Sequence, residues 1–173
     1  MSTSNIPNSG QAKPARLPRW LAYPLAFIVW CVVPWAISLL TPRYGWEEAR
    51  PGIWNLLGLI PVVVGIAGFL WAFGLHFAEA PHGLEWNVTQ GYLLMRGPYT
   101  FSRNPMYLSE LVLILGWTLF YGSIAVFIAS LIWWVTFNFF TIPLEERALE
   151  ARYGQAYADY KRRVARWLGK VSL

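Results

Sequence analysis

Two long apolar runs without a charged side chain constrain the fold of this chain more than any other feature. They extend from Leu21 to Leu40 and from Ile53 to Leu75. At about 1.5 Å per residue, a helix of about 20 residues spans about 30 Å, the thickness of the hydrocarbon core of a bilayer. Only 13% of the 173 residues are charged, whereas soluble domains average about 25%. The sequence therefore predicts an all-α integral membrane protein.

Two further apolar runs, Met106 to Tyr121 and Ile124 to Ile142, are separated only by a short turn at Gly122 and Ser123. This spacing predicts two helices that form a tight hairpin. We therefore expect about four transmembrane helices, at about residues 21–40, 53–75, 106–121 and 124–142. Pro143 is expected to end the last of them, because proline cannot donate a helical hydrogen bond.

The segments outside these runs are polar. Residues 1–19 predict a disordered cytoplasmic tail, without the pattern of a signal peptide, and residues 20–173 predict a single membrane domain. The chain after Pro143 predicts an amphipathic cytoplasmic C-terminal helix. Within the first run, Pro24 and Pro34 predict kinks, which membrane helices tolerate.

Three small residues in the second run, Gly58, Gly65 and Gly68, predict that another helix packs closely against it. Such glycines let the backbones of two helices approach, and we expect their role to be structural.

Basic residues indicate the orientation of the spans. Apart from Arg43 and Arg50, all of the 14 Lys and Arg residues lie in the N-terminal tail, the loop 76–105 or the C-terminal tail. With four spans these segments share one side, and the positive-inside rule makes that side cytoplasmic. Attraction to the lipid bilayer accounts for the net charge of +5, so a nucleic-acid partner is not expected. One cysteine and two histidines provide no obvious metal site.

Two polar motifs carry most of the chemical capacity of the chain. Gly97 to Tyr107 reads GPYTFSRNPMY and precedes the hairpin, and Glu145-Glu146-Arg147 follows it. Because the hairpin turns near residue 122, both motifs are expected at the same membrane surface. Arginine binds carboxylates bidentately, asparagine donates and accepts, and carboxylates hold hydroxyl or amino groups. The alternative is that Arg103 is a membrane anchor and that the two acids only begin a surface helix.

Two polar residues inside the predicted spans form a second group of candidates. Glu110 lies about one turn inside the third span, where an ionisable residue is a functional candidate. Asn138 lies at a similar depth in the fourth span and approaches the same region. Alternatively, Glu110 reaches the interface or bonds to neighbouring helices. His82, in the middle loop, is either a proton acceptor or a solvated side chain.

The order and spacing of these motifs resemble those of the isoprenylcysteine carboxyl methyltransferase and phospholipid methyltransferase superfamily. The resemblance covers Leu93 to Trp167 and includes Glu-Glu-x-x-Leu at residues 145–149 and the tyrosine- and arginine-containing tail. It implies an enzyme that transfers a methyl group from S-adenosyl-L-methionine to a lipophilic or small-molecule acceptor. The cofactor contacts that it implies are Leu93, Leu94, Tyr99, Asn104, Pro105, Met106, Tyr107 and Glu145. Glu146 would support them, and Gly91 and Tyr92 begin this part of the loop.

Four positions depart from the isoprenylcysteine methyltransferases. Asn104 and Gly91 stand where those enzymes have histidine, and Ser109 stands where glycine is common. Thr141 stands where they have an arginine that contacts the substrate carboxylate. The cofactor half of the site is thus better preserved than the substrate half. The acceptor stays open between prenylated cysteine, an ethanolamine phospholipid, a quinone-like lipid and a small thiol.

We assign catalytic roles to Arg103, Glu110 and Glu146. An already activated sulfonium methyl requires mainly that the reactants be positioned. Glu110 is the expected base or substrate-orienting group, which an amine or phenol acceptor would need, and Arg103 is expected to bind an anion. Two other functions remain open on the sequence, an NADPH-dependent membrane reductase of similar helical fold and a non-catalytic membrane scaffold.

Overall fold

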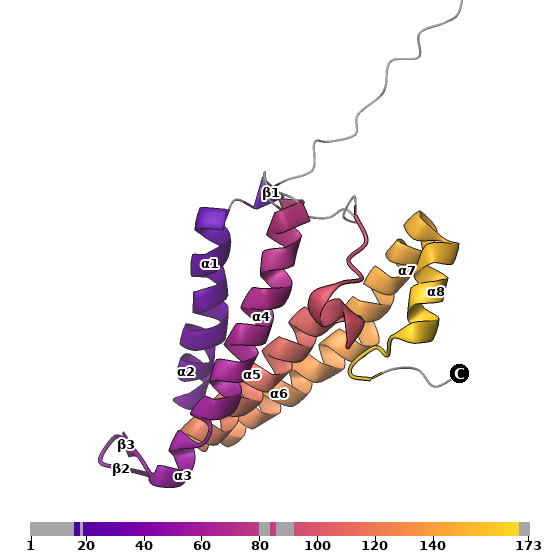
Figure 1. Cartoon of the computed structure of the whole chain (residues 1–173). Helices are drawn as coiled ribbons and strands as arrows, with labels where there is room; N and C mark the ends of the chain where they lie inside the picture. The colour runs from indigo at the N-terminus through magenta and orange to yellow at the C-terminus, as the bar shows by residue number, and fades with distance from the viewer. Residues whose placement is uncertain (1–15, 18, 80–83, 86–91, 170–173) are drawn as a thin grey trace, which may run out of the picture.

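Helices formed by the apolar runs make up most of the chain, as Figure 1 shows in a computed structural model. The structure describes residues 16–17, 19–79, 84–85 and 92–169. Its α-helices are α1 (Arg19–Phe27), α2 (Val33–Ser38), α3 (Ile53–Leu56), α4 (Leu59–Glu79), α5 (Pro105–Tyr121), α6 (Ile124–Thr136), α7 (Ile142–Tyr153) and α8 (Gln155–Arg163). Two π-helical segments are η1 (Ile28–Val32) and η3 (Phe137–Thr141), and η2 (Gly97–Thr100) is a 3-10 turn. The short strands are β1 (Arg16–Leu17), β2 (Trp46–Glu47), β3 (Arg50–Pro51) and β4 (Leu84–Glu85).

The helices run back and forth between two ends of the molecule (Figure 1). The β2–β3 hairpin and the α5–α6 turn lie at one end, where Arg43 forms a β-bridge with Ser123. The antiparallel pair β1–β4 joins the start of the described chain to the loop after α4 at the opposite end. The predicted helical hairpin is present, with Gly122 in the left-handed conformation at its turn. We call the end with β1, β4, η2 and α8 the polar end.

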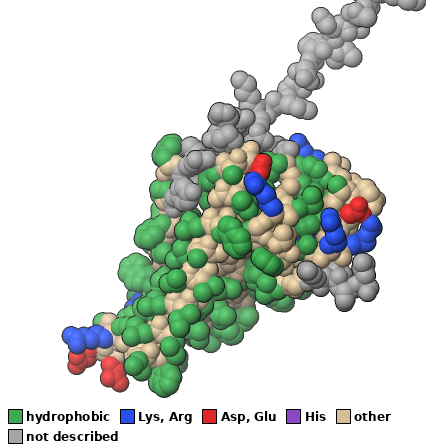
Figure 2. Space-filling view, in the orientation of Figure 1, with side chains coloured by type: hydrophobic (Ala, Val, Ile, Leu, Met, Phe, Trp, Pro, Cys, Tyr) green, Lys and Arg blue, Asp and Glu red, His purple; other side chains and the backbone are tan. Residues whose placement is uncertain are grey.

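The surface and the lengths of the helices indicate membrane association. Two continuous helices, Ile53–Glu79 and Ile124–Tyr153, are long and apolar enough to cross a membrane, and Pro24–Ser38 and Pro105–Tyr121 are shorter apolar helices. Figure 2 shows hydrophobic side chains along the middle of one face, with charged side chains gathered at its two ends. The prediction of a helical protein is therefore confirmed.

Glycines bring α4 and α5 into close contact, as the sequence predicts for Gly58 and Gly65. A Cβ atom on Gly65 would lie only 2.6 Å from the Leu113 Cβ atom, and one on Gly58 would lie 2.4 Å from the Phe120 nitrogen. Gly116 of α5 was not among the predicted glycines, yet a Cβ atom added to it would lie only 2.6 Å from the Val62 nitrogen. Close backbone approach replaces hydrophobic burial as the source of helix–helix affinity in a bilayer.

The prediction that Pro143 ends the fourth helix is wrong, because the helix continues through it to Tyr153. Five residues of π-helix, η3, come just before, and the Ile142 N–H bonds to the Phe137 carbonyl in the π pattern. Proline lacks the N–H that would continue this pattern to Asn138. The Asn138 carbonyl instead accepts a hydrogen bond from Arg166 Nη1 at 3.5 Å.

Pro34 is accommodated in the same way. It follows η1, in which the Val33 N–H bonds to the Ile28 carbonyl. Pro34 has no N–H to donate, either to the Val29 carbonyl in the π pattern or, in the α pattern, to the Trp30 carbonyl. That carbonyl accepts a hydrogen bond from the Trp117 indole at 2.5 Å, which links the first helix to α5.

Side chains from β2 and α3 satisfy the carbonyls at the end of α5. Trp46 Nε1 donates to the Phe120 carbonyl at 2.9 Å, and Asn55 Nδ2 donates to the Leu119 carbonyl at 3.2 Å. The last carbonyls of a helix have no partner within it, so these bonds fix β2 and α3 to the hairpin. They set the depth at which the α5–α6 turn lies.

Replacing Gly65 or Gly116 by alanine is expected to destabilise the protein by about 1–3 kcal/mol, since the added methyl group overpacks the α4–α5 contact. Gly74 lies on the same helix as Gly65 and has open space around it. Gly74→Ala should therefore leave stability unchanged or raise it slightly through helix propensity. Thermal unfolding of the three variants in detergent tests this, and equal melting temperatures for G65A and G74A would contradict it.

Candidate functional site

The two polar motifs meet at the polar end, as the hairpin predicts. Gly154, with φ of +50°, lets the chain reverse from α7 into α8. α8 then packs against the loop before α5, where Tyr157, Tyr160 and Val164 form a buried cluster with Leu93. The Tyr160 hydroxyl donates to the Tyr99 carbonyl at 2.7 Å. The loop that contains the first motif is therefore held by the C-terminal part of the chain.

Glu146 lies at the centre of an ion-pair network. It is 8% exposed, and its two carboxylate oxygens face Arg103 Nη1 at 3.0 Å and Arg166 Nη2 at 2.8 Å. The backbone N–H of Arg103 also donates to the Ala165 carbonyl at 3.0 Å. Two of the three residues with predicted catalytic roles thus neutralise each other. Their contacts favour a structural role that joins α7, the loop before α5 and the C-terminal segment.

Asn104 holds the same C-terminal segment. Its Nδ2 donates to the Arg166 carbonyl at 3.1 Å, and its backbone N–H donates to Ser102 Oγ at 3.0 Å. Pro105 then begins α5, where a missing N–H is harmless. Trp167 completes the contact by donating to Asn138 Oδ1 at 3.1 Å. We call residues 164–169, which these bonds attach, the C-terminal strap.

Glu145 and Glu110 differ from Glu146 because neutral donors hold them. The Tyr107 hydroxyl donates to Glu145 Oε1 at 2.5 Å, and the Tyr107 ring packs 4.5 Å from Phe137, centroid to centroid. Glu110 lies three residues further along α5 and is hydrogen-bonded by Trp133. Within the described ranges, no Lys or Arg pairs with either carboxylate. The site therefore combines two uncompensated acids with aromatic rings.

An apolar wall that contains Tyr99 lies near Glu145. Leu94 and Tyr99 are buried together with Ala72 of α4, and Met106 packs against them. Burial, with smaller contributions from Tyr160, Tyr92 and Glu145, raises the pKa of the Tyr99 hydroxyl. Tyr99 therefore stays a neutral hydrogen-bond donor beside Glu145.

The predicted cofactor contacts thus fall into three groups. Tyr107 and Glu145 meet directly, and Leu94, Tyr99 and Met106 share the wall. Asn104 supports the strap, and Pro105, next to it, begins α5. Leu93 faces the α8 cluster instead. His82 and Gly91 lie outside the described residues.

His76 is a residue at this site that the sequence analysis did not select. It lies near the end of α4, with its Nε2 atom 2.7 Å from the Tyr99 hydroxyl and its Nδ1 atom 3.0 Å from the Tyr92 hydroxyl. A single histidine at the end of an apolar run is not part of a recognisable motif, so the sequence does not indicate that it contacts Tyr92 and Tyr99. Arg166 was visible only as part of the Arg-Trp pair at residues 166–167.

The protein is helical, with two helices long and apolar enough to cross a membrane and an acidic and aromatic site at its polar end. The model of the phospholipid methyltransferase family matches residues 54–156, more than half of the chain. The chain therefore belongs to the phospholipid methyltransferase family. Membership of this family implies that the protein is a methyltransferase.

The chain is also similar to one curated protein. An uncharacterized protein of Haemophilus influenzae is 41% identical over 63 residues, which are 36% of this chain and 100% of the relative. No solved structure matches the chain.

Breaking the ion-pair network should cost more stability than breaking a surface pair. Glu146→Ala leaves two guanidinium groups without their carboxylate and is expected to cost about 3 kcal/mol, as for other buried pairs. Glu150, on the same helix, pairs with Lys161 at the surface, and Glu150→Ala should cost under about 1 kcal/mol. Chemical or thermal unfolding in detergent measures both. Equal losses for the two variants would show that the network does not hold the polar end.

Proposed function

We propose that the protein transfers a methyl group from S-adenosyl-L-methionine to a lipophilic or small-molecule acceptor at the cytoplasmic face of a membrane. Family membership supports the reaction class. The structural observation that carries the proposal is the pair of acids, Glu110 and Glu145, which are held by Trp133 and Tyr107 without a basic partner among the described residues.

The chemistry of these residues fits the proposed methyl donor. When bound, S-adenosyl-L-methionine supplies a methyl group on a positively charged sulfonium. Uncompensated carboxylates and aromatic faces attract a cationic centre. Glu145 also suits ribose hydroxyls or an amino group, and the wall of Leu94, Tyr99 and Met106 offers an apolar surface.

The protein's own contribution is to orient the reacting groups. Tyr107 fixes the Glu145 carboxylate through its short hydrogen bond and through packing on Phe137. Such preorganised groups need no rearrangement during reaction. We assign to the Glu110 carboxylate, one turn further along α5, the role of holding the acceptor and of taking up its proton if the acceptor is an amine, phenol or thiol.

Charge distribution limits the class of acceptor. Arg103 and Arg166 are both engaged by Glu146, and Thr141 occupies the position of the expected carboxylate-binding arginine. This arrangement supports an acceptor that carries no anionic group next to the reacting atom. It also disfavours the reductase alternative, since the same guanidinium groups are not available for the 2′-phosphate of NADPH.

We further propose four membrane spans with both termini and the site on the cytoplasmic side. Arg43 and Arg50 lie at the end of the molecule opposite the site, as this topology requires (Figure 1). The lengths of the two long helices and the apolar character of the two shorter ones support this topology.

Glu145→Gln tests the proposed function. The change removes a negative charge next to the cationic centre, and we expect binding of S-adenosylhomocysteine to weaken modestly and methyl transfer to fall by about 100-fold, as for loss of one preorganised electrostatic group. The measurement is mass spectrometry of membrane lipids and small molecules incubated with purified protein and isotopically labelled donor.

Glu150→Gln, one turn further along α7, is the matched control and should retain activity. Absence of labelled product and of donor binding with the unmutated protein would favour a scaffold. Binding of NADPH in place of S-adenosyl-L-methionine would support the reductase.

A further inference from the structure

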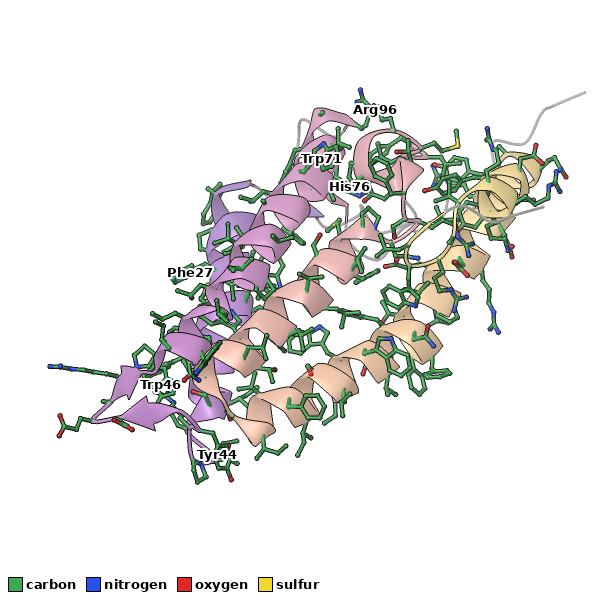
Figure 3. All side chains as sticks on the ribbon, turned by 60° about the horizontal axis from the view of Figure 1, so that its bottom comes forward. Phe27, Tyr44, Trp46, Trp71, His76 and Arg96 are labelled. Carbon is green, nitrogen blue, oxygen red and sulfur yellow. The ribbon has the colours of Figure 1, made fainter. Side chains whose placement is uncertain are left out.

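We propose that His76 is a positioning residue of the site, which acts by fixing the side chain of Tyr99. The proposal rests on the proposed function, because it concerns the wall beside Glu145. Figure 3 shows His76 at the end of α4 near Trp71 and Arg96, far from Tyr44 and Trp46 at the opposite end. Its Nε2 atom lies 2.7 Å from the Tyr99 hydroxyl, the shorter of its two side-chain contacts.

The proposal includes one tautomer of the imidazole. The Tyr92 hydroxyl lies 3.3 Å from the His76 carbonyl and 3.0 Å from Nδ1. In the proposed tautomer it donates its one proton to the carbonyl and accepts from Nδ1–H. In the neutral ring, Nε2 is then the acceptor. The Tyr99 hydroxyl, 2.7 Å away, is then the donor to Nε2, because an unprotonated ring nitrogen can only accept.

Tyr99 is held from both sides by this arrangement. α4 holds its hydroxyl through His76, and α8 holds its backbone carbonyl through Tyr160 at 2.7 Å. Its ring lies in the wall with Met106, and it is 8% exposed. Glu145 contributes to the raised pKa of the Tyr99 hydroxyl, so a displaced Tyr99 ring would change the electrostatic surroundings of the Glu145 carboxylate.

His76 therefore links the longest apolar helix before the hairpin to the site. The imidazole donates to one loop tyrosine and accepts from another, which fixes the loop at residues 92 and 99 with a single side chain. A hydrophobic residue at position 76 would fill the space but leave the Tyr99 hydroxyl without its acceptor. Glutamine, whose amide reaches the position of Nε2 and both donates and accepts, would restore the acceptor.

Binding of S-adenosylhomocysteine by the full chain in detergent, measured calorimetrically, tests the role. His76→Leu and Tyr99→Phe should each weaken binding by about tenfold, the factor that corresponds to about 1.4 kcal/mol for one buried hydrogen bond. The double variant should be no weaker than either single variant, since both remove the same bond. His76→Gln should bind within about threefold of the unmutated protein.

A spectroscopic readout separates positioning from folding. The chain has two histidines, so ¹⁵N-histidine labelling with a histidine-free tag and the change His82→Gln leaves one imidazole signal. We expect the Nδ1–H tautomer, a shift of the Nε2 resonance in Tyr99→Phe, and a further shift when S-adenosylhomocysteine is added to the protein with Tyr99 intact.

The outcomes distinguish this proposal from the proposed function. If the unmutated protein does not bind S-adenosylhomocysteine, the proposed function fails and the positioning role fails with it. If the unmutated protein binds and His76→Leu binds equally well, only the positioning role is overturned. The role would also be overturned if His76→Leu and His76→Gln both bind weakly and the His76 Nε2 resonance, in the protein with Tyr99 intact, does not shift when S-adenosylhomocysteine is added. If His76→Leu does not fold, Tyr99→Phe and His76→Gln still decide the question.

Discussion

The close contact between α4 and α5 determines how the groups on these two helices lie relative to one another. Gly65 and Gly116 let the two backbones meet without side chains between them, so the relative height of the two helices is fixed. His76 is carried by α4, and Tyr107 and Glu110 are carried by α5. A shift of one helix by a single turn, about 5.4 Å, would separate the wall from the acids. The groups of the site on α4 and α5 therefore depend on a helix interface formed by glycines, which have no reactive side chain.

Electrostatic compensation divides the polar end into a structural part and a reactive part. Adjacent residues in sequence, Glu145 and Glu146, point to different partners because successive helical positions are about 100° apart. Glu146 faces two guanidinium groups and attaches the C-terminal strap. Glu145 faces Tyr107 and keeps its charge available. Stability and reactivity are in this way assigned to neighbouring side chains of the same type.

Much of the fold follows from the sequence, because length and the absence of charge are enough to locate helices. Gly58 and Gly65 also predicted a close helix contact, and the hairpin predicted that the two motifs meet. The continuation of the helix through Pro143 could not be predicted, since it depends on a π-helical segment that no residue type signals. The network around Glu146 was missed for a different reason. A polar motif shows which groups are present, but only the tertiary structure shows which of them neutralise one another, as Arg103 and Glu146 do.

The two prolines have a consequence for how this chain is joined together. Inside a bilayer, a helix uses its own backbone amides completely, and its carbonyls are ordinarily closed to the rest of the protein. Pro34 and Pro143 each remove one donor and so leave one carbonyl for an outside partner, which Trp117 and Arg166 supply. A proline therefore acts here as an attachment point between distant segments, giving directional bonds to a region where lipid-facing surfaces provide few.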